Sequence, residues 1–155
     1  LEKLLTKYGY DAVFYPHFEV QRFLSAFHTE NPRVKIGALG QMDVQTLLMA
    51  SALLITDFSS IQFDFAYMLK PEIYYQFDEA RYWGTHHDRG YFDYRVDGFG
   101  AVVTTQEALL QAIETALASE CAVTPEMQKH IRDTFGALDD HNCERNHQAI
   151  RELMS

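Results

Sequence analysis

The sequence predicts an α/β fold in which a Rossmann-like parallel sheet is flanked by helices. Short apolar segments typical of strands alternate four times with amphipathic segments typical of helices, as in a parallel sheet covered on both faces. Polar residues gather just after several apolar segments, where α/β sheets bind their ligands. The chain has 155 residues, a length that suits one domain and can bury a core.

The predicted strands are short apolar runs that end at turn residues or at a change to polar sequence. In chain order they cover residues 12–15, 34–36, 53–55, 72–76 and 101–103. The run over residues 53–55 is apolar throughout, which is typical of a strand buried on both faces.

The predicted helices carry apolar residues at spacings of three and four. In chain order they cover residues 1–8, 20–27, 44–51, 61–68, 105–117, 124–135 and a last segment that begins at Asn142 or Cys143. Gly9 is placed to end the first helix, Asp43 to cap the third, and Pro125 lies in the first turn of the sixth. We expect Ala149, Ile150 and Leu153 of the last helix to face inward.

Residues 77–100 do not fit this alternation. They are rich in Tyr, Asp, His, Arg and Gly, and a loop of this length inside a compact domain is usually functional or partly disordered. We treat residues 1–155 as a single, partial domain, with residues 120–155 as a C-terminal helical segment. The absence of an initiator Met at Leu1 favours a fragment of a longer protein.

Composition limits the classes of function. The net charge of −9 argues against nucleic acid as a partner and against an electrostatic contact with anionic lipid from this segment. Cys121 and Cys143 are far apart and form no Cys-x-x-Cys pair, so two thiols in a reducing compartment are the simpler interpretation. No apolar run approaches the roughly 18 residues of a membrane span, and no signal peptide opens the chain.

The segment over residues 53–64 is the best candidate for a binding site. An apolar strand is followed by a turn with Thr56, Asp57, Ser59 and Ser60, and then by a helical pattern. The first turn of a helix presents unpaired N–H groups and attracts phosphate, and serine hydroxyls add further donors. The simpler alternative is that Asp57 or Ser59 only caps the helix.

Four sequence features resemble the CDP-glycerol glycerophosphotransferases, the teichoic acid polymerases and primases of Gram-positive cell-wall synthesis. The segment Ile55-Thr56-Asp57-Phe58-Ser59-Ser60 followed by Phe63-Asp64 is similar to the family signature. In the same order as in the family come Tyr15-Pro16-His17, Lys70-Pro71 and Gly90-Tyr91-Phe92-Asp93-Tyr94. The resemblance covers residues 11–112.

This resemblance implies the C-terminal, donor-binding half of a glycosyltransferase B type fold. The implied reaction transfers glycerol phosphate from CDP-glycerol, or another polyol phosphate from a related CDP-polyol, and releases CMP. The acceptor is a hydroxyl of a teichoic-acid-like polyol phosphate or of a lipid-linked molecule. A sugar-nucleotide glycosyltransferase or epimerase of the same fold, or a non-catalytic binding domain, remains as an alternative.

The resemblance also implies a missing N-terminal domain. The family associates its general base with a Trp-His-Gly element upstream, and this chain has no such element. We therefore expect this fragment alone to be inactive. The implied location is cytoplasmic, with the whole protein peripheral at the inner face of the membrane.

We assign roles to the residues that match the family motifs. His17 is the predicted catalytic residue, which stabilises charge on the departing CMP phosphate. Asp57 supports the turn, and Asp64, one helical turn beyond Ser60, is expected to be buried and to orient His17 or a loop N–H. The predicted substrate-binding residues are Gly40, Thr56, Asp57, Ser59, Ser60, Asp64 and Arg89.

We predict no metal and no cofactor. Adjacent His86 and His87 lack a third ligand at useful spacing. The chain contains no P-loop and no dinucleotide-binding fingerprint, and it has no Gly-x-Ser-x-Gly nucleophile elbow.

Overall fold

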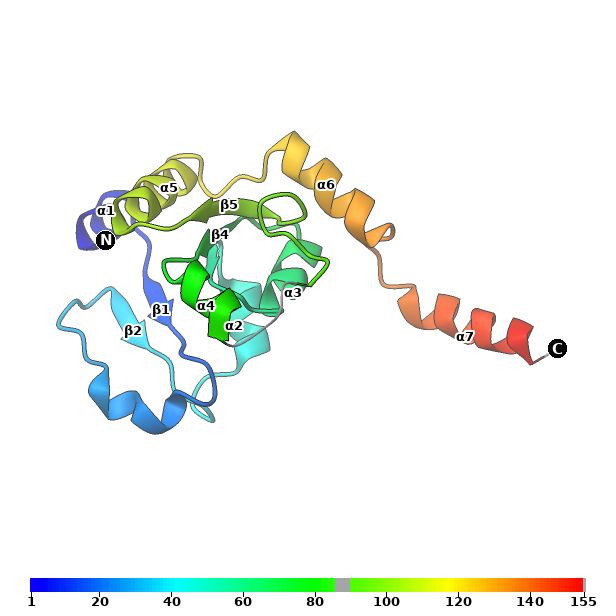
Figure 1. The fold of residues 1–155 in the computed structure, drawn as a ribbon, viewed down its shortest axis with the longest axis horizontal. Coiled ribbons are helices and arrows are strands. Elements are labelled where there is room, and N and C mark those ends of the chain that lie inside the picture. The colour runs from blue at the N-terminus through cyan, green and yellow to red at the C-terminus, as the bar shows by residue number, and fades with distance from the viewer. Residues whose placement is uncertain (86–89, 155) are drawn as a thin grey trace.

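The computed structural model describes residues 1–85 and 90–154. The strands are β1 (Ala12–Phe14), β2 (Val34–Ile36), β3 (Leu54–Thr56), β4 (Glu72–Tyr75) and β5 (Gly100–Val103). The helices are α1 (Glu2–Tyr8), the 3-10 helix η1 (Gln21–Ala26), α2 (Val44–Ala50), α3 (Ile61–Tyr67), α4 (Glu79–Thr85), α5 (Gln106–Ala118), α6 (Pro125–Phe135) and α7 (Asn142–Leu153). Figure 1 shows their arrangement.

The strands are parallel, as predicted, and they form two sheets. β1 pairs with β2, and β3, β4 and β5 form a second sheet with β4 in its centre. The alternating pattern had indicated a single sheet. Periodicity predicts where strands lie in the sequence, but it does not determine which strands pair with one another. The prediction that β3 is buried on both faces is wrong. This strand lies at the edge of its sheet, and Ile55 is 42% exposed.

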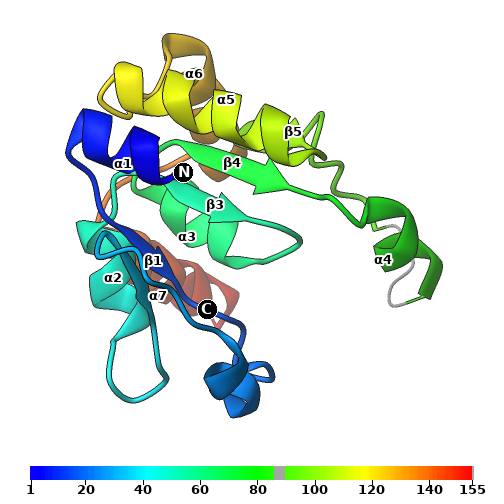
Figure 2. The same cartoon turned by 90° about the vertical axis from the view of Figure 1, so that its left-hand side faces the viewer.

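Helices cover both faces of the three-stranded sheet. α5 contacts β4 and β5 on one face and also packs against α1, while α3 contacts β3 and β4 on the other (Figure 2). Ile73 packs with Ile113 and Leu117 of α5, whereas Ala66 of α3 packs with Phe99 and with other residues on that side of the sheet. The core is therefore divided by β4, whose residues alternate between the two faces.

Local end signals act as predicted in most helices. Gly9 ends α1 in the left-handed conformation, with φ 75°. The side chains of Asp43, Thr105 and Thr124 accept hydrogen bonds from the first-turn N–H groups of α2, α5 and α6, respectively.

Two predicted segments differ from the sequence-based expectation. The amphipathic helix expected over residues 20–27 is the 3-10 helix η1, interrupted at Phe23 by non-helical backbone angles. The long loop expected over residues 77–100 contains α4, which begins two residues after Phe77. Aromatic contacts with the turn before α3 support α4, and such contacts between distant segments are not visible in local periodicity.

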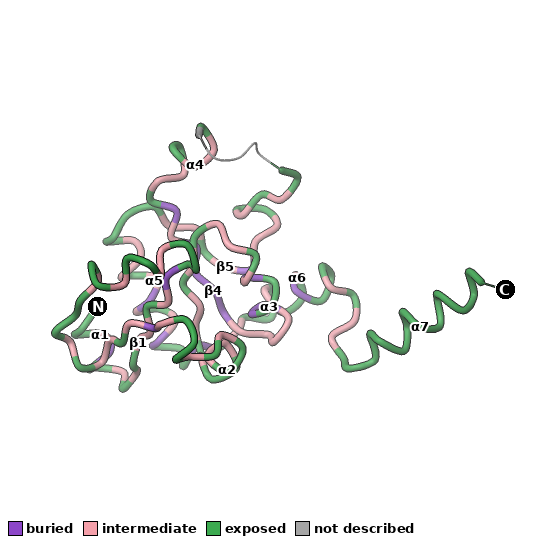
Figure 3. The backbone as a smooth tube through the Cα atoms, turned by 90° about the horizontal axis from the view of Figure 1, so that it is seen from below, coloured by how far each residue is buried: buried purple, intermediate pink, exposed green. Residues whose placement is uncertain are grey.

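The last helix extends away from the body of the protein (Figure 1). Every residue of α7 is exposed, as the green tube in Figure 3 shows, and Ile150 and Leu153 are 56% and 89% exposed. The expectation that Ala149, Ile150 and Leu153 face inward is therefore wrong. Helical spacing predicts a shared apolar stripe, but it does not say whether another segment covers that stripe.

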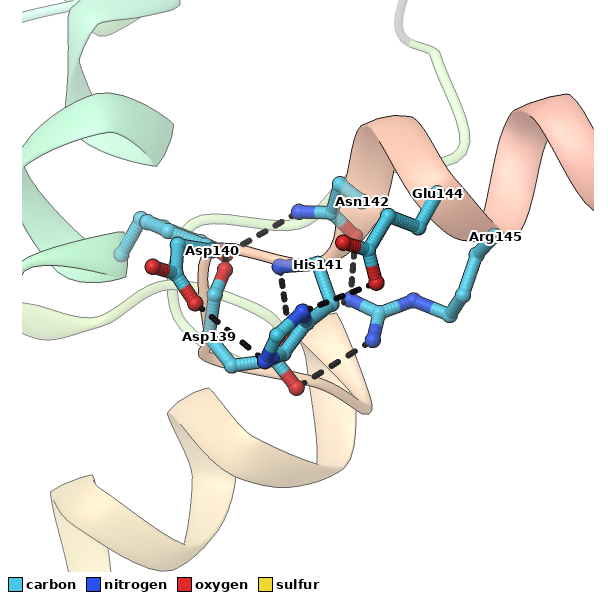
Figure 4. A network of polar contacts seen from close by, with 7 residues as sticks. Asp139, Asp140, His141, Asn142, Glu144 and Arg145 are labelled. Atoms are coloured by element: carbon cyan, nitrogen blue, oxygen red, sulfur yellow. Dashed lines mark hydrogen bonds and ion pairs between the residues drawn. The ribbon is translucent and has the colours of Figure 1, made fainter.

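Polar contacts hold the start of α7 at the end of α6 (Figure 4). The Arg145 guanidinium donates to both carboxylate oxygens of Asp139, over 3.2 and 2.8 Å. The Tyr67 hydroxyl of α3 donates to the Asp139 carbonyl oxygen over 2.9 Å, and Asn142 donates to the same hydroxyl over 3.1 Å. Within the described ranges, no helix has both the length and the apolar composition needed to span a membrane.

Candidate functional site

The predicted site residues follow the carboxyl ends of several strands. Parallel strands end at the same edge of a sheet, and the arrows of β1, β3 and β4 point toward the same side of the molecule in Figure 2. His17 follows β1, Gly40 follows β2, Thr56 ends β3 and Gln76 follows β4. The carboxyl ends of these four strands, which belong to two sheets, are therefore the candidate site.

The turn over residues 56–60 connects β3 to α3. Ser60 is the N-cap of α3 by position, but its side chain makes no capping hydrogen bond and the residue is exposed. The Ser59 hydroxyl accepts a hydrogen bond from the Ile61 N–H over 3.4 Å. The Ser60 hydroxyl consequently stays available to a ligand, whereas Ser59 helps to shape the turn.

Asp57 is linked to β4 through its backbone. Its carbonyl oxygen accepts a 3.4 Å hydrogen bond from Nε2 of Gln76, a residue that is 1% exposed. The Asp57 side chain is exposed, and its negative charge adds to the effect of burial in raising the pKa values of the Tyr82 and Tyr94 hydroxyls. These contacts are consistent with a supporting role for Asp57. The contact made by Gln76 was not predicted from the sequence.

An aromatic cluster that was not predicted from the sequence surrounds Phe58. The Phe58 ring stacks on the Tyr82 ring with centroids 3.8 Å apart. The Trp83 and Tyr94 rings meet Phe58 edge-on, at 5.5 and 5.7 Å. The cluster joins the 56–60 turn to α4 and to the segment before β5. The high aromatic content of residues 77–100 was the available indication of such a cluster.

A buried network of hydrogen bonds joins β4 to α3 and to the residue before β5. The Tyr74 hydroxyl of β4 donates to Oε1 of Gln62 on α3 over 2.6 Å and accepts from the Phe99 N–H over 3.0 Å. Each of the three residues is buried, so each hydrogen bond satisfies a group that would otherwise be desolvated at a cost. This network holds α3, and with it the turn, against the central strand.

Lys70, part of the Lys-Pro element in the family resemblance, has a structural position. Its ammonium group donates to the carbonyl oxygens of Leu48, Met49 and Ser51, at 2.9, 2.6 and 2.8 Å. These carbonyls lie at the carboxyl end of α2, where a cation is favourable. Desolvation lowers the pKa of Lys70. Lys70 therefore joins α2 to the segment before β4.

The remaining predicted site residues are dispersed. His17 is exposed, its Nδ1 accepts from the Glu19 N–H over 3.4 Å, and its ring lies 4.3 Å from that of Phe18. No hydrogen bond, ion pair or ring contact among the described residues joins His17 to the 56–60 turn or to Asp64. Gly40 adopts a left-handed conformation with φ 80°.

Asp64 is exposed, so the expectation that it is a buried acid is wrong. It lies on the solvent side of α3, whereas Gln62, Phe65 and Ala66 face the core. Arg89, His86 and His87 lie outside the described residues. Within residues 1–85 and 90–154, no three His, Cys, Asp or Glu residues are grouped in a way that would hold a metal ion.

The chain matches the family described as CDP-Glycerol:Poly(glycerophosphate) glycerophosphotransferase over residues 1–150. It is 31% identical over 147 residues to the minor teichoic acid biosynthesis protein GgaB of Bacillus subtilis (strain 168), covering 95% of this chain and 16% of GgaB. It is 36% identical over 72 residues to the teichoic acid glycerol-phosphate transferase of Staphylococcus aureus (strain NCTC 8325 / PS 47), covering 46% of this chain and 18% of that protein. The chain thus spans less than a fifth of the length of either relative.

Two solved structures of the wall teichoic acid polymerase TagF share the fold. One, of a variant, has a TM-score of 0.69 at 20% identity and covers 99% of this chain and 39% of the polymerase chain. The other has a TM-score of 0.68 at 22% identity and covers 100% of this chain and 38% of the polymerase chain. The predicted α/β fold of glycosyltransferase B type is therefore confirmed.

Proposed function

Because the chain belongs to the CDP-glycerol:poly(glycerophosphate) glycerophosphotransferase family, we propose that it forms the donor-binding part of a glycerol phosphate transferase. The donor is CDP-glycerol, the acceptor is a hydroxyl of a teichoic-acid-like or lipid-linked molecule, and CMP is released. The family match over residues 1–150 is the observation that carries this proposal. A lipid-linked acceptor would bring the whole protein to the inner face of the membrane.

The proposed reaction is a phosphoryl-group transfer. The acceptor oxygen forms a bond to the phosphorus atom of glycerol phosphate, and the bond from that phosphorus to the oxygen of CMP breaks. The acceptor proton passes to a general base, which we assign to a part of the protein outside this chain. Positioning and charge stabilisation dominate such chemistry, so a domain that holds the donor contributes directly to the rate.

The 56–60 turn is the proposed contact for the donor phosphates. The exposed Ser60 hydroxyl has no capping partner, and hydroxyl and backbone N–H groups are suitable donors for phosphate oxygens. Ser59 shapes this turn, Thr56 ends β3 just before it, and Gly40 lies in the loop after β2. With a net charge of −9, the chain needs such local donors to hold an anion.

His17 is the proposed catalytic residue, and Asp57 a positioning residue. His17 is exposed and follows β1, whose arrow points to the same side of the molecule as that of β3 in Figure 2. In this proposal a protonated imidazole stabilises charge on the departing CMP phosphate. No described contact holds its side chain toward the turn, so the role requires His17 to meet the donor when it binds. Asp57 acts through the turn, because an anion directed at a diphosphate would repel it.

A binding experiment tests the donor assignment. Backbone amide shifts of the chain are followed by NMR during separate titrations with CDP-glycerol, CDP-ribitol and a UDP-sugar. We expect saturable shifts in the 56–60 turn with CDP-glycerol, and Ser60→Ala should weaken binding about tenfold. Binding of the UDP-sugar alone would favour a sugar-nucleotide transferase, and binding of none of the three would contradict the proposal.

A kinetic experiment tests His17. In a longer protein that contains this segment, His17→Ala should lower kcat at least about a hundredfold with little change in thermal stability. His28→Ala is the matched control, because His28 is also exposed and follows η1. Equal turnover in both variants would rule out the catalytic role of His17.

A further inference from the structure

The loops that follow β1 and β2 are held against each other. The Gly37 N–H donates to the carbonyl oxygen of Phe14, the last residue of β1, over 2.8 Å. The Tyr15 ring packs directly on Gly37, so closely that a Cβ atom at Gly37 would lie 2.5 Å from Cδ2 of the ring. The first loop carries His17 and the second carries Gly40, so the two loops bring two predicted site residues into one unit.

The side chain of Gln21 makes a further connection between these loops. Its Nε2 atom donates to the Pro16 carbonyl oxygen over 2.8 Å, and its Oε1 atom accepts from the Leu39 N–H over 3.0 Å. Both distances are those of ordinary N–H···O hydrogen bonds. The partners determine which end of the amide is the nitrogen, because a carbonyl oxygen only accepts and an N–H only donates. One amide thus joins the residue before His17 to the residue before Gly40.

The backbone of Gln21 contacts the next peptide group as well. Gln21 is the first residue of η1, and its N–H donates to the His17 carbonyl oxygen over 3.2 Å. The carbonyl groups of Pro16 and His17 belong to the two peptide bonds on either side of the His17 Cα. Because each peptide group is planar, holding both groups sets the φ and ψ angles of His17 and the direction of its Cα–Cβ bond.

The imidazole of His17 has only local contacts of its own. Its Nδ1 atom accepts a long hydrogen bond of 3.4 Å from the Glu19 N–H, and its ring lies 4.3 Å from that of Phe18. The backbone held by Gln21 therefore decides where the imidazole starts from. None of the residues of η1, all of which the structure describes, is buried, so the bonds of Gln21 orient a loop and do not complete the core.

We propose that Gln21 is a positioning residue for His17, an inference that rests on the proposed function. Gln21 holds both peptide groups beside His17 and ties them to the loop that carries Gly40. The donor then meets an imidazole whose direction is already restricted, so less ordering is needed in the transition state. Without the two side-chain hydrogen bonds, the His17 loop would sample other directions and would be productive in a smaller fraction of complexes.

Steady-state kinetics of a longer protein that contains this segment tests the proposal. Gln21→Met keeps the length of the side chain and removes both of its hydrogen bonds. It should lower kcat about tenfold and change KM less than about threefold, because His17 acts on charge that develops in the transition state. The matched control is Gln111→Met, at an exposed position of α5, which should leave both constants unchanged.

A double-mutant cycle separates positioning from a structural role. Gln21→Met is added to His17→Ala, and the double variant should turn over at the rate of His17→Ala alone, because no imidazole remains to be positioned. The same tenfold loss in both backgrounds would show that Gln21 acts independently of His17 and would overturn the proposal. A kcat of Gln21→Met equal to that of the natural protein would overturn it as well.

Gln21→Glu serves as the second variant if Gln21→Met does not fold. Its carboxylate still accepts from the Leu39 N–H but has no donor for the Pro16 carbonyl, so kcat should again fall about tenfold. Natural turnover in Gln21→Glu would contradict the proposal. If His17→Ala itself turns over normally, the proposed role of His17 fails and that of Gln21 fails with it. If His17→Ala is slow and the Gln21 variants are not, only the role of Gln21 is wrong and the proposed function stands.

Discussion

Glu72→Gln is expected to remove a pH dependence from the stability of this domain. Glu72 is a residue of the central strand β4 and is 2% exposed. Neither of its carboxyl oxygens has a hydrogen-bond partner within the described part of the chain. Burial raises the pKa of the Glu72 carboxyl from its usual 4.5 to about 8. The carboxyl is thus neutral in the folded chain at neutral pH.

The direction of the effect follows from proton uptake on folding. Between pH 4.5 and about 8, Glu72 is ionised in the unfolded chain and protonated in the folded chain. The free energy of unfolding therefore falls as the pH rises through this window, by about 1.4 kcal/mol per pH unit. Across the whole window the free energy of unfolding falls by about 5 kcal/mol, which is a large part of the stability of a typical domain.

Urea unfolding of the natural chain and of Glu72→Gln, at several pH values across this window, measures the effect. Glutamine is neutral throughout, so its advantage over Glu72 should grow with pH at about 1.4 kcal/mol per unit. Contributions that are the same in both proteins cancel in the difference. Glu107→Gln, at an exposed position in the first turn of α5, controls for the loss of one carboxylate. Parallel pH profiles for the natural chain and Glu72→Gln would refute the argument from burial.

Three further substitutions or titrations test other parts of the structure. Lys70→Met should lower the free energy of unfolding by about 2 to 3 kcal/mol in urea, because three carbonyl groups lose a charged donor; a change below about 0.5 kcal/mol would contradict this role. Gly100→Ala should lower the free energy of unfolding by about 3 kcal/mol or more, since a Cβ atom would lie 1.9 Å from the Glu72 carbonyl oxygen. Gly84 has open space around it, so the control variant Gly84→Ala should fold normally by circular dichroism. The Arg145 hydrogen bonds hold the pKa of Asp139 at about 2, so its contacts at the start of α7 should persist as the pH falls and be lost only near that value; an NMR titration of Asp139 with a midpoint near 4 would contradict them.

The 56–60 turn and the elements beside it follow from the local sequence pattern. An apolar run, a polar turn and helical spacing are local features, and they correctly predicted β3, the turn and α3. The helix ends at Gly9, Asp43, Thr105 and Thr124 were also predictable, because a cap depends on residues only a few positions away. The role of Lys70 was not, since its carbonyl partners lie about twenty residues earlier in the chain.

Local sequence therefore specified the type and order of most elements, because hydrophobic spacing and capping act over a few residues. The folded chain alone decided that the strands divide into two sheets, that α7 stands clear of the body, and that Phe58 meets Tyr82, Trp83 and Tyr94. Those outcomes depend on which surfaces cover one another, and such contacts join residues far apart in the chain. The same reason explains why Gln76 was missed: its burial and its bond to Asp57 exist only once β4 lies beside β3.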